Sequence, residues 1–263
     1  LTICFVFEPA SLPGLSLALD YYQIKITDAV SSPSIGDVMD DCYAASRNPT
    51  FAFNAACAAV GRGPGGTFNG ASSPGVALPL SNLGKQTTSG FDLSVGYRFN
   101  LGGFGRVDAT LDLNSVDKYW FQATPNSVQR DCLGYYSVDC GAASSLGGPI
   151  YEQKASQRTV WTMGDFTAGY TLRYLSSVTE EPGGTNFRPE FSTIKSYTYV
   201  DLAGSWRVTK NIELRLAVAN AFDKQPPAIG NTIGTTSANS GNTFPQNYDV
   251  VGRAYTVGAS LKF

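Results

Sequence analysis

Alternation with a period of two residues is the feature that most restricts what this chain can fold into. In "SGFDLSVGYRFN" (89–100), apolar residues from Phe91 to Phe99 occupy every second position, and Asp92 to Asn100 occupy the positions between them. Successive side chains of a β-strand point to opposite faces, so this segment predicts a strand with one apolar and one polar face. The pattern recurs and predicts about nine strands, at residues 1–7, 15–26, 89–100, 106–115, 153–161, 166–174, 198–208, 211–219 and 254–263.

Composition excludes several classes of protein. Charged residues make up 15% of the chain, against about 25% in a typical soluble domain. No run of about 18 apolar residues occurs, which excludes a transmembrane helix. The net charge of −2 gives no electrostatic reason to expect a nucleic-acid partner. The chain has no histidine and no recognisable pair of nucleophile and base, so we expect no enzyme, no cofactor and no metal.

The connections between the predicted strands alternate in length. Short links are predicted at 8–14, 100–103, 162–165 and 209–211, and long ones at about 27–86, 121–152, 180–195 and 220–252. This alternation is typical of outer-membrane β-barrels, in which an apolar band of about 9–11 residues per strand faces lipid. We therefore predict an all-β fold, an antiparallel transmembrane β-barrel segment with short periplasmic turns and long extracellular loops.

Aromatic residues near the predicted strand ends agree with this interpretation. Rings of this kind are most stable where lipid headgroups meet hydrocarbon, so a barrel carries them at two levels. One set lies beside the short turns and the other near the long loops: Tyr97, Phe99, Phe104, Trp206 and Phe263, and then Tyr119, Trp120 and Tyr174.

The number and pattern of strands raise two further points. Nine is odd, whereas bacterial single-chain barrels have an even number of strands, and an open sheet would leave unpaired edges in the bilayer. We therefore expect the remaining strands to lie elsewhere in a larger protein.

In the second strand the alternation changes face between Tyr21 and Tyr22. A β-bulge and the edge of the bilayer would both explain that change.

Four of the five cysteines lie in two predicted long loops, Cys42 with Cys57 and Cys132 with Cys140. We expect a disulfide within each loop and hence an oxidising compartment, although sequence alone leaves the connectivity open. A metal site is the alternative, but neither pair has CxxC spacing.

Two short motifs receive structural interpretations. Asp37, Asp40 and Asp41 suggest cation binding, but a short surface helix capped by Ser34 is favoured. "GRGPGG" (61–66) matches the GxGxxG pattern, but it follows no strand and opens no helix, so it does not predict a nucleotide site.

Three stretches together resemble a known family. They are "LPGLSLALDYYQIKITDAV" (12–30), "NIELRLAVANAFDKQPP" (211–227) and "NYDVVGRAYTVGASLKF" (247–263). In this order they are similar to the C-terminal part of the TonB-dependent receptors of the outer membrane of Gram-negative bacteria. Ala221 stands where that family commonly has leucine.

The resemblance implies that residues 1–263 are the last part of a barrel of about 22 strands with a plugged lumen. The plug domain and the earlier strands would lie upstream. Such receptors import scarce ligands, such as siderophores, vitamin B12 or oligosaccharides, with energy delivered by TonB. The implied partners are membrane lipid, the plug, TonB, the ligand and the barrel-assembly machinery. A passive porin and a surface adhesin-like barrel are the alternatives.

Several residue roles follow from this interpretation. The terminal alternation is similar to the signal read by the assembly machinery, and it comprises Tyr255, Val257, Ala259, Leu261 and Phe263. The polar row is expected to face the lumen and plug, and it comprises Asp92, Arg98, Asp108, Asp112, Arg173, Asp201, Arg207, Glu213 and Arg215. Arg253 can pair with an acid such as Asp201 or Glu213. Candidate ligand contacts in the loops are Tyr135, Tyr136, Asn231 and Asn239.

Overall fold

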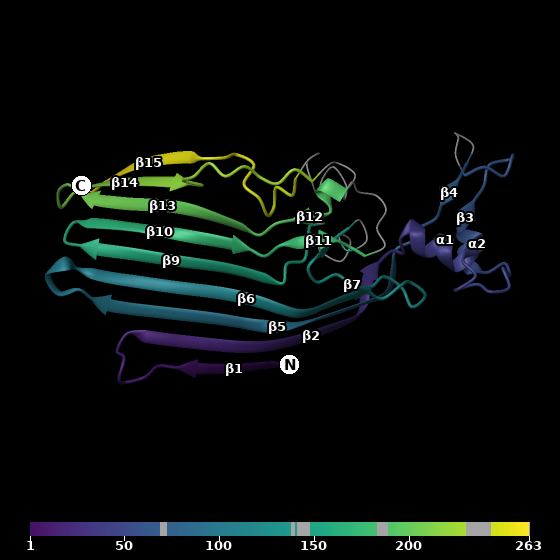
Figure 1. Cartoon of the computed structure of the whole chain (residues 1–263), viewed down its shortest axis with the longest axis horizontal. Coiled ribbons are helices and arrows are strands. Elements are labelled where there is room, and N and C mark those ends of the chain that lie inside the picture. Colours follow the sequence, from purple (N-terminus) through teal and green to yellow (C-terminus); the bar gives the residue numbers. More distant parts are fainter. Residues whose placement is uncertain (69–72, 138–139, 141–147, 183–188, 230–242, 263) are drawn as a thin grey trace. The chain divides into compact units, whose positions relative to one another are not determined.

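The computed structural model describes residues 1–68, 73–137, 140, 148–182, 189–229 and 243–262. Its main element is an antiparallel sheet in which nine strands follow one another in chain order (Figure 1). These strands are β1 (Thr2–Phe7), β2 (Leu15–Ser31), β5 (Ser81–Asn100), β6 (Arg106–Gln122), β9 (Gln153–Met163), β10 (Phe166–Leu175), β13 (Tyr197–Arg207), β14 (Ile212–Ala219) and β15 (Ala254–Leu261). The nine predicted strands are therefore confirmed, and each pairs with its neighbour in sequence.

The chain divides into two compact units. Unit 1 comprises Leu1–Gln23, Ser89–Lys118 and Cys132–Phe263, and unit 2 comprises Ile24–Thr88 and Tyr119–Asp131. Besides the long strands, unit 1 contains β8 (Tyr135–Tyr136), β11 (Val178–Glu180), β12 (Thr193–Ile194) and two 3₁₀ turns (Gly102–Phe104 and Pro189–Phe191). Unit 2 contains α1 (Ile35–Tyr43), α2 (Ala55–Ala59), β3 (Val60–Gly61), β4 (Gly75–Val76) and β7 (Arg130–Asp131). No helix in the described ranges is both long and apolar enough to cross a membrane.

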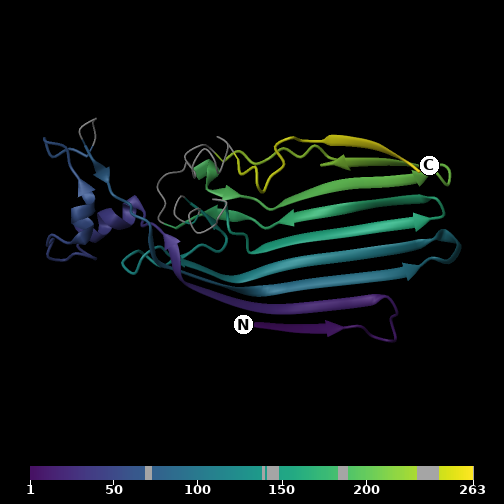
Figure 2. The same ribbon diagram turned by 180° about the vertical axis from the view of Figure 1, so that it is seen from behind.

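The short connections of unit 1 lie at one end of its strands and its long loops lie at the other, as the two opposite views show (Figures 1 and 2). Two of the short turns require glycine. Gly105 has a φ of +89°, and a β-carbon there would overlap the carbonyl oxygen of Thr162 in β9. Gly14, with a φ of +90°, would likewise overlap the carbonyl oxygen of Arg98. These glycines let adjacent hairpins approach closely at this end.

Three strands are longer than their alternation predicts. β2 continues to Ser31, β5 begins at Ser81, and β6 continues to Gln122. The 20 residues of β5 rise about 3.3 Å each and span roughly 65 Å, about twice the ~30 Å hydrocarbon thickness of a bilayer. Outside lipid neither face of a strand has to be apolar, so the alternation stops although the backbone pairing continues.

The change of face within β2 is not caused by a bulge at that point. Pairing with β1 runs without interruption from Phe7 and Leu17 to Thr2 and Tyr22. Tyr21 packs against Phe91, with 5.1 Å between the ring centroids, and the Tyr22 hydroxyl lies 3.2 Å from Nδ2 of Asn114 on the opposite face. The two tyrosines therefore lie on opposite faces, as in a regular strand.

The apolar face of the sheet is exposed in the isolated chain, and its aromatic side chains cluster near the short turns. Phe166 and Trp206 stack with their ring centroids 5.5 Å apart, and Tyr97 stacks on Phe99 at 5.1 Å. The Trp161 indole N–H donates to the Phe104 carbonyl over 2.7 Å. This is the level at which an interfacial aromatic belt is expected.

Candidate functional site

The nine charged residues of the predicted polar row lie on the same face of the sheet. The registers of β6, β9, β10, β13, β14 and β15 place Asp108, Val160, Gly169, Ala203, Ala217 and Thr256 in one line across this face. Hydrogen bonds from Ser94 to Asp112 and from Asn114 to Asp92, both 2.7 Å long, join β5 to the same face. We call it the polar face.

Most charges on the polar face form cross-strand or same-strand pairs. Asp108 pairs with both Arg98 and Arg106, and Arg215 pairs with Glu213 over 2.7 Å. Arg173 donates two hydrogen bonds to Asp201, of 2.7 and 3.1 Å. Arg207 lies 3.9 Å from Asp165 in the adjacent turn. Pairs of this kind stabilise neighbouring strands modestly.

Asp201 also fixes the start of the last long loop. It accepts a 2.8 Å hydrogen bond from the backbone N–H of Asn220, the residue that follows β14. Asn220 is 1% exposed, and its side chain bonds to both the N–H and the carbonyl of Lys224. The "ANAFDK" segment is therefore a structured exit from the sheet.

The sequence suggests that Arg253 pairs with Asp201 or Glu213, but the structure shows neither pair. Its backbone N–H donates to Asp223 over 2.9 Å and its guanidinium reaches the Ala221 carbonyl at 3.3 Å. Asp201 and Glu213 are already engaged by Arg173 and Arg215. Arg253 thus ties β15 to the loop exit of β14.

A cavity of about 420 Å³ opens on the polar face at the end nearest the long loops. We call it the upper pocket. Its polar lining residues come from five strands and one loop: Asp92, Ser94, Asp112, Asn114, Lys154, Ser156, Arg173, Tyr199 and Asn247. The volume falls within the range of about 300–1,000 Å³ that is usual for ligand sites. A second hollow, of about 580 Å³, lies toward β13–β15 and is lined largely by small residues such as Gly169, Ala203 and Ala217.

The long loops of unit 1 pack around a buried aromatic cluster, which we call the loop core. Its members are Tyr136, Tyr151, Val178, Ile194, Tyr199, Ile229, Phe244 and Tyr248, with Leu175 and Tyr197 against them. The Cys132–Cys140 disulfide is also buried, and its half-cystines are 0% and 1% exposed. Cations cover the edges of the cluster, because Lys154 lies 5.1 Å from the Tyr151 ring and Arg173 lies 5.0 Å from the Tyr199 ring.

Burial changes the acidity of the loop-core tyrosines. It raises the pKa of Tyr136, which also lies near the Glu180 carboxylate, to about 12. Burial likewise raises the pKa of Tyr248 to about 12 and raises the pKa of Tyr151 as well. Desolvation disfavours the phenolate form, so these hydroxyls stay protonated at neutral pH.

Of the four predicted ligand contacts, two lie in the described loops and two lie outside the described residues. Tyr136 is 1% exposed and donates a hydrogen bond to the Phe191 carbonyl, so its side chain belongs to the loop core. Tyr135 is half-buried in β8, which pairs with β11. Asn231 and Asn239 lie outside the described residues, as does Phe263 of the terminal row. The other members of that row, from Tyr255 to Leu261, occupy the apolar face of β15 opposite β14.

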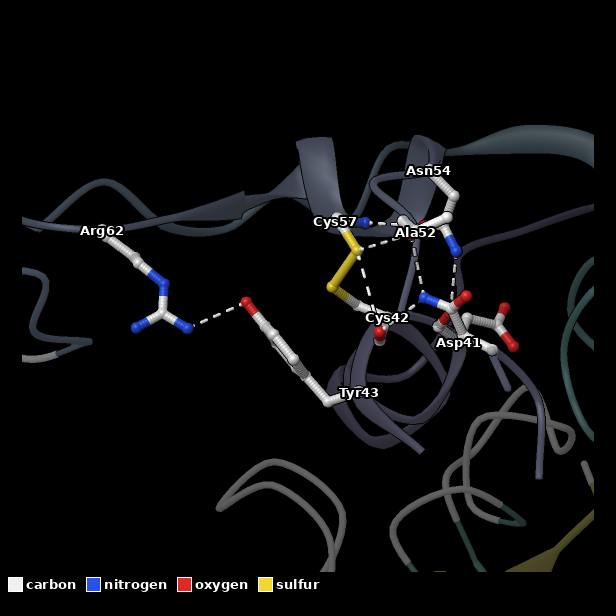
Figure 3. The surroundings of a disulfide bond; sticks show 8 residues. Asp41, Cys42, Tyr43, Ala52, Asn54, Cys57 and Arg62 are labelled. Atoms are coloured by element: carbon white, nitrogen blue, oxygen red, sulfur yellow. Dashed lines mark hydrogen bonds between the residues drawn. A yellow bond between two sulfur atoms is a disulfide. The ribbon is translucent and has the colours of Figure 1, made fainter. Parts of the chain in front are cut away.

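Unit 2 contains the predicted surface helix and a disulfide that links its two helices (Figure 3). The Ser34 side chain accepts from the N–H of Asp37 over 3.1 Å and caps α1, which confirms the helix. Cys42 is bonded to Cys57 with an S–S distance of 2.08 Å. Asn54 caps α2 and donates to the Asp41 carbonyl over 2.9 Å. Among the described residues, no group of three potential metal ligands comes together.

Comparison with known families decides the classification. The family described as "TonB dependent receptor-like, beta-barrel" matches residues 6–221. The chain belongs to the TonB-dependent receptor family. Members of this family are outer-membrane proteins of Gram-negative bacteria and act as transporters, not enzymes.

Solved structures of TonB-dependent receptors share this fold. The ferric enterobactin receptor of Pseudomonas aeruginosa, in complex with enterobactin, has 14% identity and a TM-score of 0.60. The FrpB iron transporter of Neisseria meningitidis has 14% identity and a TM-score of 0.56. The ferric-catecholate import receptor Fiu of Escherichia coli K12 has 16% identity and a TM-score of 0.53.

These receptors are much longer than the present chain. Each alignment covers 100% of this chain, but only 31%, 30% and 27% of those receptors, respectively. No protein with a curated description matches the sequence.

Several residues that line the upper pocket of this TonB-dependent receptor were not predicted from the sequence, among them Lys154 and Asn247. Lys154 stands at the start of β9, the strand with the weakest alternation, and its register opposite Asn114 places it on the polar face. Asn247 lies in the loop before β15, and only the fold of that loop brings it to the pocket. The first could have been found by extending the alternation of β9, whereas the second leaves no local signal.

Proposed function

We propose that residues 1–263 are the C-terminal part of the barrel domain of an active outer-membrane importer, whose plug domain and remaining strands lie elsewhere in the protein. The observation that carries this proposal is the match to the TonB-dependent receptor barrel over residues 6–221. The order of the nine strands, each beside its neighbour in sequence, supports it, because a barrel built from hairpins requires that order.

In this proposal the two faces of the sheet have different partners. The apolar face contacts lipid, and β15 presents Tyr255, Val257, Ala259 and Leu261 there, the row that the barrel-assembly machinery would read. The polar face lines the lumen and contacts the plug. Its paired charges favour this role, because they can be hydrated or can bond to plug backbone groups without an unpaired charge being buried.

The imported ligand is a scarce compound taken up with energy delivered through TonB. Solved structures with this fold include a ferric enterobactin receptor, a ferric-catecholate import receptor, an iron transporter and a copper transporter. For this chain the ligand classes are a siderophore, vitamin B12 or an oligosaccharide. The two disulfides in the long loops support exposure to an oxidising compartment, as at the cell surface.

An uptake experiment tests the proposal. The full-length receptor is expressed in a host that lacks related receptors, and accumulation of radiolabelled candidate ligands is measured with and without TonB. Active import predicts accumulation that is lost when TonB is deleted. Equal accumulation in both strains would indicate a passive porin, and surface binding without accumulation would indicate an adhesin-like barrel.

A further inference from the structure

The upper pocket contains both hydrogen-bond donors and hydrogen-bond acceptors. The two carboxylates that line it, Asp92 and Asp112, have no cationic partner among the described residues. Asp92 accepts a hydrogen bond from Asn114, and Asp112 accepts one from Ser94, both from neutral donors. Neither carboxylate forms an ion pair within the part of the chain that the structure describes. Each retains an oxygen that can accept a further hydrogen bond.

The cations of the upper pocket do not outweigh these carboxylates. Arg173 is neutralised by its two hydrogen bonds to Asp201. The Lys154 ammonium packs 5.1 Å from the Tyr151 ring and has three donors available. In the described part of the chain, the pocket therefore has two carboxyl groups without an ion-pair partner and one ammonium group. An anionic ligand such as a ferric catecholate would meet net repulsion here.

Asn247 lines the upper pocket from the loop side. Its Oδ1 has no hydrogen-bond partner among the described residues, but this oxygen is closed to solvent and so to a ligand in the pocket. The pocket thus offers acceptors at Asp92 and Asp112 and a donor at Lys154. Hydroxyl groups both donate and accept, and a ligand that carries several of them can satisfy all three positions.

We propose that the upper pocket binds a neutral, polyhydroxylated ligand, that is, an oligosaccharide. This inference rests on the proposed import function and selects one of its ligand classes. Asp92 and Asp112 accept hydrogen bonds from ligand hydroxyls, and Lys154 donates to a hydroxyl or ring oxygen. Charge-assisted bonds of this kind are the stronger ones and would supply much of the affinity.

The test uses the full-length receptor purified in detergent. It is screened against an array of neutral oligosaccharides and, in parallel, against ferric enterobactin as an anionic probe. The strongest array member is then titrated calorimetrically into the wild type, Asp112→Ala, Lys154→Met and the control Asp108→Ala. Asp108 lies on the same face of the same strand, but it does not line the upper pocket. Resistance to heat in gel electrophoresis verifies that each variant is folded.

We expect neutral oligosaccharides to bind and ferric enterobactin not to bind. Asp112→Ala and Lys154→Met should each weaken oligosaccharide binding by roughly 10-fold to 100-fold, whereas Asp108→Ala should leave it unchanged. The inference is overturned if no array member binds, if the pocket variants bind like the control, or if ferric enterobactin binds and Lys154→Met weakens it. Oligosaccharide binding without TonB-dependent accumulation would overturn the proposed function alone.

Discussion

At the scale of single residues, Asn220 stabilises the exit from β14 in three ways. It adopts a φ of +49°, a left-handed conformation that asparagine tolerates better than most residues. Its side chain bonds to both backbone groups of Lys224, and its N–H donates to Asp201. The position therefore needs a short polar side chain that can turn the chain and satisfy a buried loop.

Replacement of Asn220 separates these contributions. Asn220→Gly removes two hydrogen bonds but keeps the conformation, and should destabilise the full-length receptor by about 1–3 kcal/mol. Asn220→Ala also strains the backbone, and should cost about 1–2 kcal/mol more. Thermal unfolding in detergent measures both, with the exposed Asn211→Ala as a control. Equal melting temperatures for the two Asn220 variants would contradict the role of the left-handed conformation.

The loop-core tyrosines predict a response to alkaline pH. Burial raises the pKa of Tyr136 and of Tyr248 from 10.0 to about 12. Because the folded-state pKa lies above the unfolded one, the two protonated hydroxyls contribute to the free energy of unfolding. This contribution is complete below pH 10 and is lost as the pH rises through 12. We expect the loop core to open in this window, measured by tyrosinate absorbance and protease sensitivity. Tyr248→Phe should reduce the loss, and an unchanged response would contradict the assignment.

At the scale of elements, the alternation within each strand assigns its two faces. Leu216 is 52% exposed on the apolar face, opposite Val257 of β15, and the next residue, Ala217, pairs with Ala203 and Thr256 on the polar face. Leu216→Arg would place a charge in lipid, at a cost of about 2–4 kcal/mol near the midplane. We expect it to impair membrane assembly of the full-length receptor, quantified in isolated outer membranes, much more than Ala217→Arg does. Similar yields of the two variants would contradict the face assignment.

Strands were predictable from sequence where lipid imposes a pattern, and not elsewhere. The β13–β14 hairpin has polar and apolar positions that alternate up to its turn, and the sequence places both strands to within one residue. The outer part of β5, "SNLGKQTT", has no apolar face, and it is held by backbone pairing and by a 2.6 Å hydrogen bond from Gln86 to the Tyr119 hydroxyl. For the same reason the sequence predicts the polar row but not the upper pocket. Asn247 reaches that pocket only through packing of the loop core.

At the scale of the whole molecule, the chain consists of two units with separate internal contacts. Unit 2 has its own disulfide and a buried ion pair in which Arg130 lies 3.5 Å from Asp37. Unit 1 contains the loop core and all residues that line the upper pocket. The long loop between β14 and β15 therefore contributes residues to the loop core and to the upper pocket, whereas the long loop between β2 and β5 belongs to unit 2.

This division predicts unequal effects of two loop replacements in the full-length receptor. Replacing residues 32–80 with an Asn-Gly turn should leave the barrel assembled and the upper pocket able to bind, because these residues lie in unit 2. The same replacement of residues 221–253 should disrupt binding, because that loop supplies Ile229, Phe244 and Tyr248 to the loop core and Asn247 to the pocket. Heat resistance in gel electrophoresis and oligosaccharide titration measure the two properties. Loss of assembly in the first variant would show that unit 2 is required for the fold of unit 1.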